Sequence, residues 1–355
     1  MKTNEEITSY EPKNFKENYK AFLVDLLTKD YEFCKSREAA EKKCNKIALD
    51  LRKKGKIIKD RSERSYKLYI DPDNKKNDKF YSDLSNFLNA ARISRKNNKI
   101  LSFEANEAPY GMITVYYKDK YGNKQHFTVH SDQFGFSAVP CIYFRKNYPL
   151  SRYFEMQKNK SDKDPDAIAE FIANYVYTTR TIGGSFLWPE TLHEQYNKHR
   201  GNGSYIEDRV DLTLLEIKHY FEYRELDDKK NFKYSGDILF SRYKIPDAQT
   251  WFGFFDSFED YVDFFMFNDF VEDIGIGGKK EYMPINILNG EPFEKDCLYY
   301  EEDILKNICE KGLKDVLERV MNMVANRTKN MEKLIAKYNQ TNDTKGEKHE
   351  NILHE

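Results

Sequence analysis

Residues 180–211 hold the side chains in this sequence that are best suited to bind an anion or to move a proton. Arg180, Arg200 and Arg209 fall within this stretch, and Asp208 and Asp211 flank the last of them. A guanidinium group can hold a carboxylate or a phosphate through two parallel hydrogen bonds. An aspartate can act as a general base or as a charge partner. These residue types together predict a site for a phosphate-bearing molecule.

Glycines separate these charged residues. Gly183-Gly184 interrupts an apolar run, and Gly201 follows in a polar loop that also contains Asn197. A glycine pair within a strand marks a bulge or a close approach of the backbone to a neighbour. Two interpretations stay open. Either a ligand lies against the glycine pair with Arg180 beside it, or another element of the protein packs tightly there.

A helix is predicted to begin at Ser204, because Ser204 and Glu207 form the Ser-x-x-Glu capping pattern and apolar residues recur at helical spacing over 210–221. The helix dipole disfavours a cation near a helix N-terminus, so Arg209 is expected to reach a carboxylate or a ligand. The free N–H groups of the first turn would add to an anion site. We therefore expect one cluster made of Arg180, Gly183, Gly184, Arg200, Asp208, Arg209 and Asp211.

Two further groups of polar residues lie outside this stretch. His130-Ser131-Asp132 cannot form a catalytic triad, since successive strand residues point to opposite faces; Asp132 alone is kept as a candidate site residue. Residues 245–278 contain eight acidic residues and no Lys or Arg. Their acids are expected to face water on a core helix, or else Asp263 or Asp269 meets Arg200 or Arg209.

The pattern Thr-Ile-Gly-Gly, Asn-x-x-Arg-Gly, Asp-Arg-x-Asp-Leu-Thr-Leu and Tyr-Val-Asp-Phe-Phe resembles an uncharacterised bacterial family of unknown function. The resemblance covers roughly residues 65–290 and departs in the first 60 residues, around 155–168 and at Trp188. It implies no established activity. The candidate catalytic residues are Asp132, Asp208, Arg209 and Asp211; the candidate substrate-binding residues are Arg180, Gly183, Gly184, Asn197, Arg200 and Gly201; no metal ligand is predicted.

The elements that position these residues predict an α+β fold. Residues 112–129 form the clearest hairpin, with a turn at Gly122-Asn123. A strand is expected over 175–188, another around 134–144 and a short one over 66–70. Helices are expected over 13–56, 78–91 and 204–221. The prediction is a small antiparallel sheet containing the 112–129 hairpin, surrounded by helices.

Four segments are expected along the chain: an N-terminal helical extension over 1–60, a main α+β domain over 65–300, a C-terminal helix over 301–338 and a disordered tail over 339–355. The 58 basic and 59 acidic residues nearly cancel, so no overall electrostatic field attracts the protein to nucleic acid. The five cysteines lack zinc-ligand spacing, and no apolar run approaches the ~20 residues of a membrane span. A reduced, cytoplasmic protein with no membrane segment is predicted.

Two functions fit these residues. The first is an enzyme acting on a phosphate-bearing substrate, either a nucleotide cofactor such as NAD or an RNA; analogy with other proteins of AT-rich bacterial genomes suggests a toxin or phage-defence effector. The second is a non-catalytic regulatory or partner-binding protein with a structural Arg/Asp network, whose N-terminal helices offer a surface for a protein partner. The sequence identifies neither a cofactor nor an oligomeric state.

Overall fold

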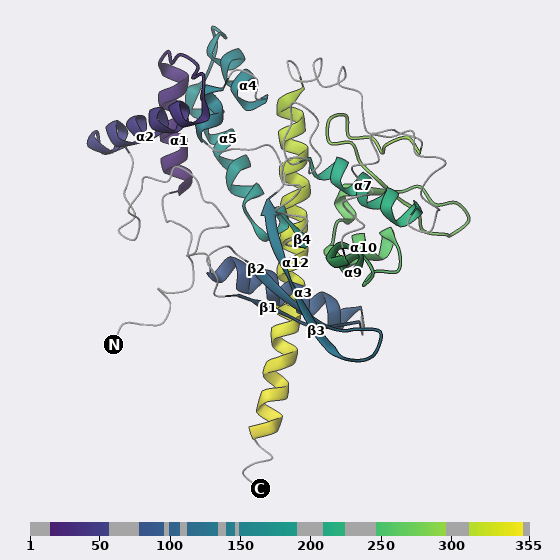
Figure 1. The fold of residues 1–355 in the computed structure, drawn as a ribbon. Helices are drawn as coiled ribbons and strands as arrows, with labels where there is room; N and C mark the ends of the chain where they lie inside the picture. The colour runs from purple at the N-terminus through teal and green to yellow at the C-terminus, as the bar shows by residue number, and fades with distance from the viewer. Residues whose placement is uncertain are drawn as a thin grey trace.

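The computed structural model describes residues 15–56, 78–95, 99–106, 112–133, 140–145, 149–189, 209–223, 246–295 and 312–350. Figure 1 shows their arrangement. The α-helices are α1 (Phe15–Thr28), α2 (Arg37–Lys53), α3 (Asp78–Ser94), α4 (Pro149–Lys158), α5 (Pro165–Thr179), α7 (Val210–Tyr223), α9 (Pro246–Phe252), α10 (Phe258–Phe265) and α12 (Leu313–Glu350). The strands are β1 (Ile100–Ala105), β2 (Met112–Lys118), β3 (Lys124–Gln133), β4 (Ser185–Pro189), β5 (Val271–Asp273) and β6 (Tyr282–Pro284).

The main sheet has the order β1-β2-β3-β4, and every neighbouring pair is antiparallel. Strands β2 and β3 pair from Met112 opposite His130 to Lys118 opposite Lys124, which confirms the predicted hairpin. Helix α3 covers one face of this sheet through Ser85 and Asn89, whose side chains both donate to the carbonyl oxygen of Phe103. The α+β prediction is therefore confirmed. Strand β1 was not predicted.

The strand predicted over 175–188 is wrong in its first half. Residues 175–179 end helix α5, and only Ser185–Pro189 form a strand. The β-branched and aromatic residues there favour a strand by propensity. The helix begins with Asp164 as N-cap and Pro165 in its first turn, and it buries Ile172 and Val176 on one face. This burial against α1 and α12 overrides the local preference.

The helices α1, α2, α4 and α5 lie together on one side of the molecule (Figure 1). Tyr19 of α1 and Tyr143 meet at the centre of this group, where the two hydroxyls are 3.1 Å apart. Residues 140–144 form a 3-10 helix, η2 (Pro140–Phe144), although a strand was predicted there. Pro140 lacks the N–H group that a sheet ladder needs. Residues 134–139 and the strand predicted over 66–70 lie outside the described residues.

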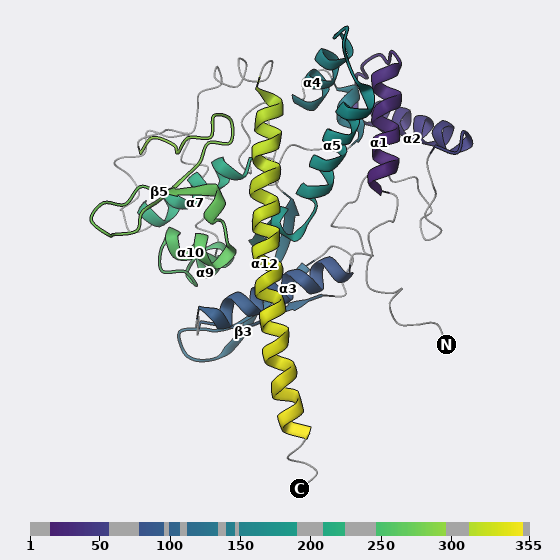
Figure 2. The ribbon, with the colours of Figure 1, turned by 180° about the vertical axis from the view of Figure 1, so that it is seen from behind.

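Helix α12 runs through the molecule and crosses α3 (Figure 2). It continues to Glu350, so residues 339–350 are helical although a disordered tail was predicted. These residues are polar and cannot bury a core of their own, which suggested disorder. Once a buried helix is nucleated, however, each further residue is added at little cost. Residues 301–311 and 351–355 lie outside the described part of the chain.

Aromatic rings fill the space between the sheet and α7. Trp251 and Phe255 are fully or almost fully buried, and Tyr261 is 1% exposed. The Trp251 ring packs edge-on against Phe127 of the hairpin, and the Phe221 ring of α7 lies 6.4 Å from Tyr261. This packing fixes α9, α10 and α7 to the sheet. It also explains why residues 245–278 are so rich in aromatic side chains.

Candidate functional site

Arg209 and Asp211 form a buried ion pair at the beginning of α7. Arg209 Nε donates to Asp211 Oδ1 at 2.9 Å, and Arg209 Nη2 donates to Asp211 Oδ2. Arg209 is 4% exposed and Asp211 is 1% exposed. The pairing is bidentate, which is the strongest geometry for a guanidinium and a carboxylate. The structure therefore brings together two of the residues that the sequence proposed as catalytic.

The position of Arg209 relative to the helix differs from the prediction. Helix α7 begins at Val210, and Arg209 stands just before it, with its carbonyl oxygen accepting from the N–H of Thr213 at 3.1 Å. The expected start at Ser204 placed Arg209 inside the helix; Ser204 to Asp208 lie outside the described residues. The unfavourable charge at this helix N-terminus is offset by Asp211 in the first turn.

The loop that follows β6 closes over this ion pair. Asp211 Oδ2 accepts from the N–H of Ile287 at 3.0 Å, and Arg209 Nη2 donates to Asn286 Oδ1 at 3.2 Å. We call these four residues, Arg209, Asp211, Asn286 and Ile287, the Arg209 cluster. The carbonyl oxygen of Ile287 in turn accepts from Arg319 Nη1 of α12 at 2.5 Å. The Arg209 cluster thus joins α7, the loop and α12.

The glycine pair lies against α12, in the 3-10 turn η3 (Ile182–Gly184). A Cβ added to Gly183 would stand 2.2 Å from Thr328 Oγ1 and 2.6 Å from both Thr328 N and Val324 O. A Cβ added to Gly184 would stand 2.1 Å from the carbonyl oxygen of Thr179. Both positions are closed to any side chain. Of the two interpretations, tight packing by another element is the one that these distances favour.

Arg327 of α12 is the buried cation that the sequence analysis missed. It is 2% exposed, and it donates to three backbone carbonyl oxygens, those of Phe265 at 2.9 Å, Gly183 at 2.7 Å and Ser185 at 2.8 Å. Its guanidinium carbon lies 3.8 Å from the centre of the Phe267 ring. Burial lowers the pKa of Arg327 to about 9. An arginine at helical spacing between Val324 and Met331, within an apolar stripe, was the available signal.

Arg180 follows the last residue of α5 and is half-buried. Burial and the neighbouring Tyr143 raise the pKa of Tyr19 well above its usual range, and the charge of Arg180 opposes that rise. Arg180 therefore lies within electrostatic reach of Tyr19 on α1. It is not among the residues that make up the Arg209 cluster.

The structure places the remaining candidates only in part. It shows two groups, the Arg209 cluster and the glycine pair. Helix α12 joins them, because Arg319 bonds to the Arg209 cluster and Arg327 bonds to Gly183. These two arginines are about 12 Å apart along the helix, at a rise of about 1.5 Å per residue. The backbone of Asp132 pairs with Phe186 across β3 and β4. Asn197, Arg200, Gly201 and Asp208 lie outside the described residues, so the single cluster predicted from the sequence stays a prediction for them.

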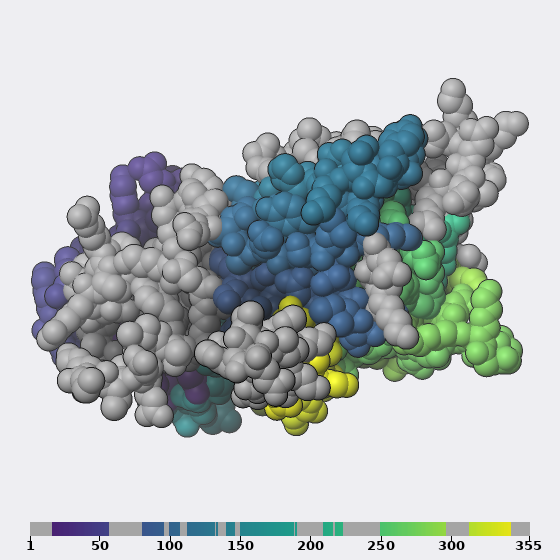
Figure 3. All heavy atoms as spheres, turned by 90° about the horizontal axis from the view of Figure 1, so that it is seen from below, coloured from purple at the N-terminus to yellow at the C-terminus, as the bar shows by residue number. Residues whose placement is uncertain are grey.

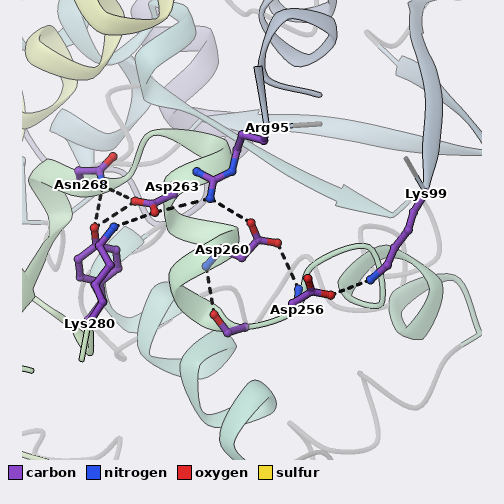
Figure 4. Close-up of polar contacts among 9 residues, drawn as sticks. Arg95, Lys99, Asp256, Asp260, Asp263, Asn268 and Lys280 are labelled. Atoms are coloured by element: carbon purple, nitrogen blue, oxygen red, sulfur yellow. Dashed lines mark hydrogen bonds and ion pairs between the residues drawn. The ribbon is translucent and has the colours of Figure 1, made fainter. Parts of the chain in front are cut away.

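The acid-rich segment is held by cations from neighbouring elements (Figure 4). Arg95, just after α3, lies 3.1 Å from Asp260 Oδ1 and 3.6 Å from Asp263 Oδ2, and Lys99 lies 2.9 Å from Asp256 Oδ1. Lys280 Nζ lies 2.8 Å from Asp263 Oδ2. Asp263 thus meets Arg95 and Lys280 and not Arg209; its other predicted partner, Arg200, lies outside the described residues, so that pairing stays a prediction.

The environment of Asp263 sets its protonation. Burial alone would raise its pKa, but hydrogen bonds from Lys280, Asn268 and Tyr282 outweigh that effect and hold the pKa below its ordinary value. Burial raises the pKa of Asp269, which was the other acid proposed to meet an arginine. Through Asp260 and Asp263, which pair with Arg95 and Lys280, the acid-rich segment holds α10 against the end of α3 and against the β5–β6 hairpin.

The part of the chain that the structure describes contains no group of three or more His, Cys, Asp or Glu residues arranged to hold a metal ion. Cys34, Cys44 and Cys141 are free thiols, and burial raises the pKa of Cys44 and Cys141. Within the same described ranges, none of the helices combines the length and the apolar composition that crossing a membrane requires.

Comparison with known proteins gives one match. No curated protein and no solved structure matches the chain. The model of a family of unknown function, DUF6994, matches residues 65–331 and so includes every candidate site residue named above. The match also covers the glycine pair, the Arg209 cluster and Arg327. The chain belongs to this family of unknown function.

Proposed function

We propose that this protein is a non-catalytic binding protein, in which the Arg209 cluster and the glycine pair hold the fold together. The observation that carries this proposal is the closed geometry of the Arg209–Asp211 pair. Both oxygens of Asp211 accept from Arg209, one of them also accepts from Ile287, and neither residue is more than 4% exposed. An anion-binding arginine needs donors directed towards a ligand.

The same argument applies to the glycines. A ligand that lay against Gly183 would need the space that Thr328 and Val324 occupy. Arg327 also takes the carbonyl oxygen of Gly183 as an acceptor. The alternative, an enzyme acting on a phosphate-bearing substrate, then depends on Arg180, Asp132 and four candidates outside the described residues: Asn197, Arg200, Gly201 and Asp208.

The test is to separate stability from anion binding at the Arg209 cluster, with inorganic pyrophosphate as the probe. Arg209→Ala should lower the midpoint of thermal unfolding, because it leaves Asp211 buried without its cation. Pyrophosphate should raise the midpoint of the wild type and of Arg209→Ala equally, or of neither. A rise in the wild type that Arg209→Ala abolishes would instead identify an anion site and favour the enzyme.

The cellular location that we propose for this protein is inferred from its sequence. We place it in a bacterial cytoplasm, where its composition and free thiols fit a reducing compartment. A role as a toxin or phage-defence effector has only analogy behind it. Expression of the wild type in a bacterial host, beside Arg209→Ala, tests that role: growth arrest by the wild type alone at equal soluble levels would support an effector.

A further inference from the structure

We propose that the outer face of the β2–β3 hairpin binds single-stranded nucleic acid. We call this surface the hairpin face and define it by Tyr116, Lys118, Lys120, Tyr121, Lys124 and His126. The inference supplies a partner for the binding protein proposed above and rests on that proposal. The two can fail separately, because the hairpin face shares no residue with the Arg209 cluster.

The two faces of this hairpin differ sharply. Ile113, Val115 and Val129 point to one face and have no exposed surface, since α3 and the aromatic core cover them. The alternate positions of the same strands point the other way. There, Lys118, Lys124 and His126 are exposed and Tyr116 is half-buried. Strands β2 and β3, drawn in blue-teal, lie at the surface of the molecule in Figure 3.

Two lysines stand directly opposite each other at the outer end of the hairpin. Lys118 pairs with Lys124 in the antiparallel register, and both are exposed. Like charges directly opposite in a sheet are destabilising. Lys120, also exposed, adds a third cation in the turn. None of the ion pairs within the described residues involves these three lysines. Such a concentration of positive charge fits a polyanion.

Aromatic rings lie beside these lysines. The rings of Tyr116 and His126 form a cross-strand pair with centroids 5.9 Å apart. Tyr121 at the tip is 76% exposed, and the Lys120 ammonium lies 5.1 Å from its ring centre. Positions two residues apart on a strand are about 7 Å apart, so the Tyr116–His126 pair and the Lys118–Lys124 pair are separated by about that distance along the hairpin. Aromatic rings that stack on bases, next to cations that hold the backbone, are how proteins bind single strands.

The turn is built to hold Tyr121 in place. Asp119 Oδ1 accepts from the N–H groups of Tyr121 and Asn123, each at 2.9 Å, and Oδ2 accepts from the side chains of Asn123 and Gln125 at 3.3 Å. Gly122 has a φ of 85°, which favours glycine. The carboxylate of Asp119 is therefore engaged within the turn. A rigid turn presents its aromatic ring at a low cost in conformational entropy.

A membrane surface is the competing partner for a basic and aromatic tip. Binding in a bilayer interface needs a continuous apolar area that can be buried among the lipids. The hairpin face carries one exposed tyrosine at its tip, and its other members are cations, a histidine and a half-buried tyrosine. Stacking on bases uses such separate rings, whereas lipid burial does not. The chemistry of this face favours nucleic acid.

The experiment measures the affinity of the full chain for a fluorescently labelled oligouridylate and for the matching oligothymidylate. We expect Tyr121→Ala to weaken binding roughly five- to a hundredfold, the range for loss of one stacked base, and Tyr121→Phe to keep it. Lys120→Glu should also weaken binding, and Lys124→Gln should reduce the salt dependence by about one phosphate contact. Lys120, Tyr121 and Lys124 are all exposed, so all four variants should unfold at the same temperature as the wild type.

The matched control is Lys279→Glu, which reverses an exposed lysine at the tip of the β5–β6 hairpin. It should leave the affinity unchanged. Equal affinities for the two oligonucleotides would show that the hairpin face binds both RNA and DNA. A higher affinity for one of them would identify that nucleic acid as the partner. Absence of binding at low salt would overturn the inference, as would equal weakening by Lys279→Glu. Binding to phosphatidylserine vesicles without binding to either oligonucleotide would overturn it in favour of a membrane.

Discussion

The Arg209 cluster and the hairpin face are both rich in charged residues, but these residues are buried and paired in the first and exposed in the second. Arg209 and Asp211 are buried, and each satisfies the other. Lys118 and Lys124 are exposed and face a like charge across the strand pair. The guanidinium of the buried ion pair bonds to groups of the protein itself, whereas an exposed pair of cations still attracts anions.

The comparison separates residue type from residue role. The central stretch contains all the features that suggested a site: arginines, aspartates, glycines and a helix beginning. In the described residues these features connect elements of the fold, from α7 through the loop at Asn286 to α12. The hairpin has no arginine and no helix beginning. Its importance becomes visible only when the register places Lys118 opposite Lys124.

The largest effect is expected at the Arg209 cluster. Asp211→Ala should lower the free energy of unfolding by about 3–5 kcal/mol, because it leaves the guanidinium of Arg209 buried and unpaired. Chemical denaturation followed by circular dichroism measures this. The control is Glu318→Ala, which removes an exposed i,i+4 partner of Lys314 and should cost at most about 0.5 kcal/mol. Equal costs for the two variants would break the contrast between buried and exposed charge.

A second test concerns the glycine pair. Gly183→Ala should cost roughly 1–3 kcal/mol of stability, because its Cβ meets Thr328 and Val324. Adding Thr328→Ala removes the Oγ1 atom but leaves the backbone contacts at 2.6 Å, so the double variant should recover only part of the loss. Unchanged stability of Gly183→Ala, measured in the same denaturation experiment, would show that the space is open to a ligand.

Asp263 gives a test that depends on pH. Asp263→Asn should cost about 1 kcal/mol at neutral pH, since hydrogen bonds to Lys280 and Tyr282 weaken. The folded pKa of Asp263 lies below its ordinary value of 3.8. Its contribution is therefore fully present above that value and is lost as pH falls through the folded pKa. The difference between wild type and variant should shrink below about pH 4; a difference that grows there would contradict this assignment.

The smallest effect on stability is expected in the hairpin turn. Asp119→Ala should leave the midpoint of thermal unfolding almost unchanged, because the hydrogen bonds of this half-buried residue stay within residues 119–125 at the end of the hairpin. It should weaken oligonucleotide binding roughly two- to tenfold, since Tyr121 loses the turn that orders it. Desolvation alone would raise the pKa of Asp119, but the N–H groups of Asn123 and Tyr121 hold it below its usual range. Binding that does not depend on Asp119 would show that the turn plays no part.

The sequence predicted the local features that depend on neighbouring residues. The turn at Gly122 and the alternation around it predicted the β2–β3 hairpin, which the strand register confirms. The α+β class followed from such patterns. The family resemblance also pointed to the segment that the family model matches.

Features that depend on distant residues could not be predicted. Residues 175–179 have strand propensity, but packing on α1 and α12 makes them helical. The contact of Gly183 with Val324 and Thr328 joins positions more than a hundred residues apart, and no local pattern reveals it. The same holds for Arg327, whose acceptors are the carbonyl oxygens of Gly183, Ser185 and Phe265.

The central claim is that Arg209 and Asp211 stabilise the fold and bind no ligand. A double-mutant cycle with Arg209→Ala, Asp211→Ala and the double variant tests it most directly, with stability and oligonucleotide affinity measured on the same preparations. We predict a coupling free energy of about 1–3 kcal/mol in stability and an unchanged affinity for every variant that is still folded. Wild-type stability in Arg209→Ala, together with loss of binding or of a cellular phenotype, would contradict the claim.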